Sequence, residues 1–273
     1  MGPNFLCIGT YRAGTTWLYR VLKEHPDIFL PDEKELMFFS HHYDKGIGWY
    51  EKFFEGRRGE KCAGDISPTY LSSPQAAGRI YRHFPDIKLI ASLRNPPEQV
   101  YSLYNLWLSR GYTDKDVKTV IEEEAEFLDN ILYWRHLSRY LEFFDRDRIL
   151  VLLFEDLRKD PKAYLKEVYD FLGVEEFYPE SVYEKYNQFR EPRNMMVEKL
   201  ITGTGDLLRR LRLLKLKSVL NRLGVSEGIK RFNTKGAEKD AIPEDVRKRI
   251  NEHVREDTRR LEEFLGRDLS FWR

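Results

Sequence analysis

Apolar runs mark the strands that the sequence predicts. They occur at Phe5–Ile8, Lys88–Leu93 and Arg148–Phe154. Apolar character without alternation is typical of strands that are buried on both faces of a parallel sheet. A further segment, Lys61–Tyr70, predicts a short strand that ends in a turn at the same edge of the sheet.

Segments with helical spacing separate these strands. The prolines Pro96 and Pro97 start one helix, and the remaining helices are expected at about Thr15–Glu24, Ser73–Phe84, Val117–Phe144, Pro161–Leu172 and Pro243–Leu265. Strands that alternate with helices indicate an α/β fold in which helices cover both faces of a parallel sheet. A helical C-terminal portion follows. The 273 residues, 41% of them hydrophobic, suffice for one large core, so we expect residues 1–273 to form a single domain.

Residues 189–242 differ in character and are predicted to form a helical, basic insert. Within this insert, Leu207–Leu223 combines leucines with arginines and lysines at helical spacing. Such a basic amphipathic helix either contacts an anionic membrane surface or polyanion, or packs on the domain with one solvated face. The second interpretation is favoured. Ile229–Asp240 is a basic, glycine-containing loop before the last helix.

Composition and charge limit the class of protein. The 46 basic and 45 acidic residues give a net charge of +1, which provides no general attraction to nucleic acid. Two cysteines, Cys7 and Cys62, do not form a disulfide framework, and buried thiols fit a reducing compartment. The chain shows neither a signal peptide nor an apolar run of about 20 residues, the length that spans a membrane. We therefore expect a cytoplasmic protein.

The loop Gly9–Gly14, between the first strand and the first helix, is a candidate anion site. Its glycines allow backbone N–H groups to converge, and the N-terminus of the following helix adds partial positive charge. A nucleotide-hydrolysing P-loop needs a lysine after the last glycine, but Thr15 and Thr16 stand there. Arg12 is the cation of this loop. It offers a planar fork of donors to a phosphate or sulfate without requiring a metal.

The run TYRAGTTWL resembles the 5′-phosphosulfate loop of sulfotransferases that use 3′-phosphoadenosine 5′-phosphosulfate (PAPS). That family commonly reads Y-P-K-S-G-T-T-W, with lysine where this chain has Arg12. The resemblance implies a P-loop-like fold and a PAPS site formed in part by Arg12, Ala13, Gly14, Thr15, Thr16 and Trp17. It also implies that Arg12 contacts the sulfuryl oxygens, with no metal.

A second resemblance concerns the catalytic base. The segment HPDIFLPDEKELMFF is similar to the glycan-type branch of the family, and its K-E-x-x-F-F pattern resembles the segment that carries the catalytic glutamate of heparan-sulfate-type sulfotransferases. Glu35 falls on that position. The segment Asp65–Tyr70 resembles the family motif E-K-T-P-x-Y, with Ile66 in place of the lysine.

Two further motifs resemble contacts to the 3′-phosphate of PAPS. The pattern R-[ND]-P-x-[ED]-x-x-x-S-x-Y begins at Arg94 and includes Ser102. The triplet Thr234–Gly236 is similar to a loop that folds over the nucleotide, which implies roles for Lys235 and Gly236. Relatives usually bracket this loop with a cysteine pair, which is absent here because no cysteine follows Cys62.

The resemblance spans Phe5 to Trp272 and implies an EC 2.8.2-type enzyme. Glu35 would act as general base for in-line sulfuryl transfer from PAPS to a hydroxyl or amine, on a carbohydrate or a lipid-linked acceptor. Two alternatives stay open on the residues alone. One is a P-loop kinase or NTPase, which the missing lysine disfavours. The other is a non-enzymatic protein that binds membranes or polyanions through residues 207–223.

Overall fold

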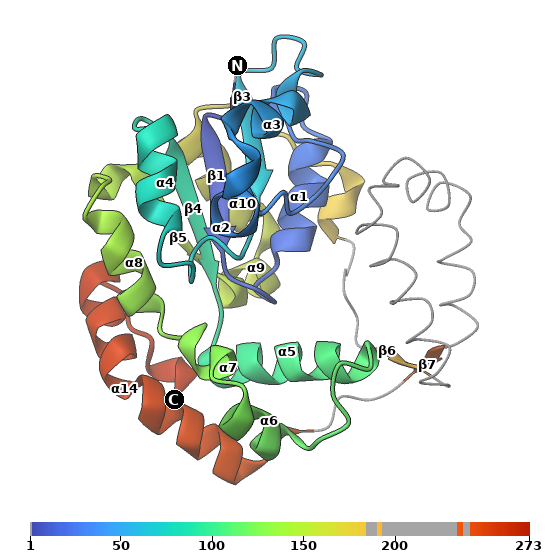
Figure 1. Cartoon of the computed structure of the whole chain (residues 1–273), viewed down its shortest axis with the longest axis vertical. Coiled ribbons are helices and arrows are strands. Elements are labelled where there is room, and N and C mark those ends of the chain that lie inside the picture. The colour runs from blue at the N-terminus through green and yellow to red at the C-terminus, as the bar shows by residue number, and fades with distance from the viewer. Residues whose placement is uncertain (1, 184–189, 193–233, 237–240) are drawn as a thin grey trace.

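The computed structural model describes residues 2–183, 190–192, 234–236 and 241–273 (Figure 1). The predicted insert at 189–242 therefore lies largely outside the described residues, and the predicted helix at Leu207–Leu223 lies outside them entirely. Two short strands of this region are described, and they pair antiparallel: β6 (Arg190–Pro192) and β7 (Thr234–Gly236).

A five-stranded parallel sheet forms the centre of the fold. Its strand order is β2-β3-β1-β4-β5, so the first strand lies in the middle. The strands are β1 (Phe5–Gly9), β2 (Ile28–Phe29), β3 (Cys62–Ile66), β4 (Lys88–Leu93) and β5 (Ile149–Leu153). This sheet confirms the predicted fold class. The two-residue strand β2 was not predicted because it is too short to show a pattern.

Hydrophobic clusters cover both faces of the sheet, which explains the apolar runs. Leu6 and Ile8 of β1 pack into one cluster, and Phe5 and Cys7 pack into the other. Successive side chains of a strand point to opposite faces, so a strand covered on both faces must be apolar throughout.

The helices complete the two layers around the sheet (Figure 1). Buried residues of α1 and α10 belong to the cluster that contains Phe5, whereas α4, α5, α8 and α14 contribute to the cluster that contains Leu6. The α-helices are α1 (Thr15–Lys23), α2 (Phe38–His41), α3 (Ile47–Glu51), α4 (Ala76–His83), α5 (Pro96–Ser109), α6 (Val117–Glu123), α7 (Glu126–Asp129), α8 (Tyr133–Leu141), α9 (Phe154–Lys159), α10 (Pro161–Leu172) and α14 (Glu244–Leu265). Short 3-10 helices are η1 (Tyr43–Lys45), η2 (Lys52–Phe54), η3 (Arg146–Arg148), η4 (Glu180–Tyr183) and η5 (Ser270–Trp272).

The structure refines several predicted boundaries. The long helical region 117–144 is divided into α6, α7 and α8, and residues 154–159 form the separate helix α9. The predicted last helix is confirmed as α14. Among the described residues, no helix is both long and apolar enough to cross a bilayer.

Candidate active site

Three predicted segments meet where parallel strands end. Arg12 follows β1, Ser67 follows β3 and Arg94 follows β4. The three strands are neighbours in the sheet and run in the same direction, so their carboxyl ends lie at one edge. In open α/β sheets this edge is the usual place of ligand binding.

The first loop forms a cradle that depends on a glycine. Gly14 has a left-handed backbone with φ 85° and immediately precedes α1. A Cβ atom there would lie 2.7 Å from Cδ2 of Leu157, so a larger residue would have to displace that side chain of α9. The first N–H groups of α1 have no carbonyl partner within the helix, and they add to the partial positive charge at this end.

Two polar side chains hold the cradle from the neighbouring strand and helix. The Ser92 hydroxyl donates to the Ala13 carbonyl at 2.6 Å. Gln99 Nε2 donates to the Tyr11 carbonyl at 3.2 Å. Both side chains are fully buried. Neither residue was assigned a role from the sequence, although a serine inside the apolar run KLIASL was a signal that could have been used.

The structure brings Arg12, Arg94 and Ser102 together. Arg12 Nε donates to Ser102 Oγ at 3.0 Å, and Arg94 Nη1 donates to the Arg12 carbonyl at 3.0 Å. Arg12 itself has a left-handed backbone, with φ 64°. The residues come from two predicted motifs that are far apart in sequence, and here they form one positively charged cluster beside the N-terminus of α1.

The surroundings of Arg94 fix its position. Its guanidinium lies 4.8 Å from the ring centre of Phe154, and Nη2 is 3.4 Å from a carboxylate oxygen of Glu98. Tyr133 donates a 2.8 Å hydrogen bond to the Arg94 carbonyl. Burial lowers the pKa of Arg94, and the carboxylates of Glu98 and Glu155 oppose that change.

Two guanidinium groups in one buried cluster make it electropositive. Burial and the charge of Arg94 lower the pKa of Arg12 to about 10, and Arg110 acts in the same direction. Arg12 therefore stays charged at neutral pH, but at a cost that a bound anion would offset. Such clusters favour phosphate or sulfate groups.

Glu35 lies near this cluster. Its charge opposes the fall in the pKa of Arg12 and contributes to a raised pKa of Tyr11. The Glu35 side chain is 31% exposed and forms an ion pair with Lys34, a residue that was assigned no role from the sequence. It is thus partly exposed and close enough to Arg12 for the two charges to interact.

Trp17 and the β7 residues occupy different positions. The Trp17 indole is buried, and its Nε1 donates to the Val182 carbonyl at 3.1 Å; a contact with adenine stays a prediction. The backbones of Lys235 and Gly236 pair with β6, which contacts α5, the helix that carries Ser102. Their predicted segment is therefore linked to the element that carries Ser102 through β6. Thr15 is buried and Thr16 is partly exposed at the first turn of α1.

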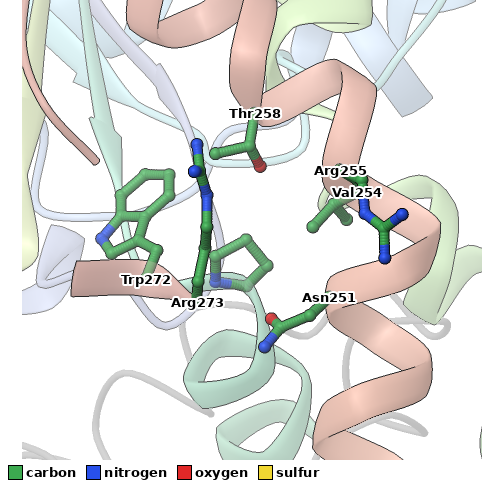
Figure 2. A pocket seen from close by; sticks show the side chains of 7 residues that line it. Asn251, Val254, Arg255, Thr258, Trp272 and Arg273 are labelled. Carbon is green, nitrogen blue, oxygen red and sulfur yellow. The ribbon is translucent and has the colours of Figure 1, made fainter. Parts of the chain in front are cut away.

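Two pockets border α5, the helix that carries Ser102. One, of about 400 Å³, is lined by Glu98, Tyr101, Ser102, Ala241, Ile242, Glu244 and Arg247. The other, of about 150 Å³, lies between α14 and the C-terminal residues Trp272 and Arg273 (Figure 2). None of the predicted site residues lines this second pocket, whereas the first includes Ser102. In the part of the chain that the structure describes, no group of three or more His, Cys, Asp or Glu side chains could hold a metal ion.

Comparison with known proteins identifies the family. A sulfotransferase domain model matches residues 3–211. The membrane-associated sulfotransferase kil1 of Dictyostelium discoideum is 35% identical over 151 residues, which are 52% of this chain and 32% of that protein. Mouse heparan sulfate glucosamine 3-O-sulfotransferase 6 is 28% identical over 211 residues, or 74% of this chain and 60% of that protein.

Mouse bifunctional heparan sulfate N-deacetylase/N-sulfotransferase 4 is 31% identical over 203 residues, covering 64% of this chain and 23% of that protein. The chain thus spans less than two thirds of the length of these curated relatives. A solved sulfotransferase from Alicyclobacillus acidocaldarius superposes with a TM-score of 0.73 at 25% identity, and the match covers 100% of this chain and 99% of that one. The chain therefore belongs to the sulfotransferase family of enzymes and is related to its heparan sulfate branch.

Proposed function

We propose that the protein transfers a sulfuryl group from PAPS to a hydroxyl or amine acceptor, with a glycan as the favoured class. The observation that carries the proposal is the cluster of Arg12, Arg94 and Ser102 at the N-terminus of α1. The names of the heparan sulfate relatives support a glycan acceptor. A lipid-linked acceptor is a further outcome of acceptor screening.

The residues at the edge of the sheet fit such a donor. When bound, PAPS supplies the sulfuryl group and leaves as a nucleotide with a 3′-phosphate. The N–H groups at the start of α1 and the Arg12 guanidinium suit the anionic 5′ end, with Gly14 giving the backbone room for a close approach. Arg94 and Ser102 would hold the 3′-phosphate, together with Lys235 and Gly236.

Glu35 would accept the proton of the acceptor group during in-line attack. Its carboxylate is accessible and lies close enough to Arg12 for the two charges to interact. Arg12 would stabilise the negative charge that develops on the transferred group. Positioned charges that stabilise the transition state are a main source of rate acceleration in phosphoryl transfer, to which sulfuryl transfer is chemically similar.

The test is transfer of radiolabelled sulfate from PAPS to a panel of acceptors that includes desulfated heparan sulfate. Glu35→Gln should lower kcat by roughly 100-fold or more, which is the usual contribution of a positioned general base. Its affinity for 3′-phosphoadenosine 5′-phosphate (PAP) should stay within about twofold. Glu33→Gln is the matched control because Glu33 is an exposed carboxylate two residues away.

Other outcomes would contradict the proposal. Equal turnover by Glu35→Gln and wild type would show that Glu35 is not the general base. Magnesium-dependent ATP hydrolysis, without sulfate transfer, would support the kinase or NTPase alternative, although Thr15 stands where those enzymes need lysine. Heparin or anionic liposome binding that survives Glu35→Ala and Arg94→Ala, again without transfer, would support the non-enzymatic alternative.

A further inference from the structure

A buried carboxylate lies behind the segment that carries Glu35. Asp65 is the fourth residue of β3 and is 2% exposed. Its Oδ1 accepts a hydrogen bond from Ser67 Oγ at 2.9 Å. Its Oδ2 accepts from the hydroxyls of Tyr70 at 2.7 Å and Tyr50 at 3.3 Å. Burying an unpaired carboxylate would cost much free energy, and the three hydroxyl donors compensate that cost.

Two of these hydroxyls continue to the backbone next to Glu35. Ser67 Oγ accepts from the Met37 N–H at 3.0 Å, and the Tyr70 hydroxyl accepts from the Phe38 N–H at 2.9 Å. A hydroxyl has one hydrogen to donate. When that hydrogen points at Asp65, the lone pairs remain for the backbone N–H groups, so the carboxylate sets the direction of both hydrogen bonds.

The segment that these bonds hold has an unusual backbone. Glu35 has φ 63° and Met37 has φ 51°, both in the left-handed region. Residues other than glycine occupy this region at a cost and keep it only where the surrounding structure enforces it. Met37 also immediately precedes α2, so its backbone sets the point at which the aromatic residues Phe38 and Phe39 enter the core.

We propose that Asp65 is a positioning residue for Glu35, acting through Ser67 and Tyr70, which fix the backbone of Met37 and Phe38. The carboxylate does not touch the substrate. Its effect is to keep Glu35 within reach of the charge of Arg12. This inference rests on the proposed role of Glu35 as general base, and it adds a second carboxylate whose only task is geometric.

The chain offers a matched set of variants for the test. Tyr70→Phe and Ser67→Ala each remove a hydroxyl that links Asp65 to the 37–38 backbone. Tyr50→Phe removes a hydroxyl from the same carboxylate, but its hydroxyl makes no such link in the described structure. All three would be assayed in the full chain beside Glu35→Gln, with kcat and the acceptor KM determined separately, and with PAP titration as the test of folding.

We expect Tyr70→Phe and Ser67→Ala to lower kcat by about 10-fold to 100-fold, as small displacements of a catalytic group do, with PAP affinity within about twofold of wild type. Tyr50→Phe should retain kcat within about twofold. Hydrogen exchange of the peptide that contains Met37 and Phe38 should accelerate in Tyr70→Phe and Ser67→Ala only.

The outcomes separate this inference from the proposed function. If Glu35→Gln is inactive while Tyr70→Phe and Ser67→Ala keep wild-type kcat, the proposed positioning of Glu35 through these two hydroxyls is overturned, and the base assignment stands. If Tyr50→Phe loses as much turnover as Tyr70→Phe, the effect is general loss of packing and the positioning role is overturned. Full activity of Glu35→Gln would overturn both.

Discussion

Arg12 makes two contacts, one through its guanidinium and one through its backbone carbonyl, and only the first depends on its being arginine. Its Nε donates to Ser102, and its carbonyl accepts from Arg94. Because guanidinium has several N–H groups in a rigid fork, the bond to Ser102 leaves other donors of the same group for an anion. The family usually places lysine here, so this chain keeps the charge and adds a fixed link between the first loop and α5.

Asp65 gives a prediction for stability against pH. Burial raises the pKa of Asp65 to about 6, and hydrogen bonds from Tyr70, Ser67, the Leu36 backbone and Tyr50 act against that rise. At pH values between the ordinary carboxyl pKa and this raised pKa, Asp65 is protonated in the native state and deprotonated in the unfolded state. Raising the pH through this window therefore lowers the free energy of unfolding.

We expect the contribution of Asp65 to the free energy of unfolding to fall by on the order of 1 kcal/mol between about pH 5 and pH 8. Urea denaturation of wild type and Asp65→Asn at both pH values measures it. As the pH rises, the free energy of unfolding of wild type should fall relative to that of Asp65→Asn. A shift in the opposite direction would mean that the native pKa lies below the ordinary value.

The turn between β1 and α1 requires glycine at position 14, for reasons of backbone conformation and of packing. Gly14 lies between a strand end and a helix start, with φ 85°, and Leu157 and Phe154 of α9 occupy the space that a Cβ atom would need. Both the backbone conformation and the nearby side chains disfavour any residue other than glycine. The motif TYRAGTTWL is thus constrained by packing, in addition to its proposed role in anion binding.

Gly14→Ala should destabilise the protein by roughly 1–3 kcal/mol because it forces a strained φ and a close contact. Chemical denaturation of the full chain measures the loss. Gly48→Ala is the control, since Gly48 lies in α3 with negative φ, and a Cβ atom added there would meet no atom within 4 Å. A neutral Gly14→Ala would contradict the described turn.

The elements that the sequence predicted are those with a strong local pattern. The apolar runs at β1, β4 and β5 and the proline-started α5 were predicted because burial on both faces and a fixed proline φ are visible in single segments. The short helix α9 and the breaks between α6, α7 and α8 were missed, since they depend on tertiary packing. The Asp65 network was also missed because its hydroxyls reach residues some 30 positions away. A carboxylate inside a buried strand was its signal.

At the scale of the whole molecule, the C-terminal 3-10 helix η5 packs against the turn that carries Arg94. The Trp272 carbonyl accepts from Asn95 Nδ2 at 3.1 Å, and its indole Nε1 donates to Glu155 Oε2 at 3.3 Å. Glu155 Oε1 in turn accepts from the Asn95 N–H at 3.0 Å. The C-terminal segment therefore supports the residue that follows Arg94, although it lies far from β4 in sequence.

Trp272→Ala should cost about 3–5 kcal/mol of stability, as does removal of other large buried side chains, and should weaken PAP binding by loosening the Arg94 turn. Phe271→Ala is the matched control because Phe271 is 49% exposed and Trp272 is 1% exposed. Thermal denaturation and PAP titration of both variants measure the two effects. Equal losses in the two variants would contradict a specific role for Trp272.

Calorimetric titration with PAP tests the proposed donor site most directly, because comparison with 5′-AMP measures how much the 3′-phosphate contributes to affinity. PAP, 5′-AMP and magnesium-free ATP would be compared on wild type, Arg94→Ala and the exposed-site control Arg255→Ala. We expect tight binding of PAP that depends on both the 3′-phosphate and Arg94 and is unchanged in Arg255→Ala. Equal affinity for PAP and 5′-AMP, or full PAP affinity in Arg94→Ala, would contradict a PAPS site at this edge of the sheet.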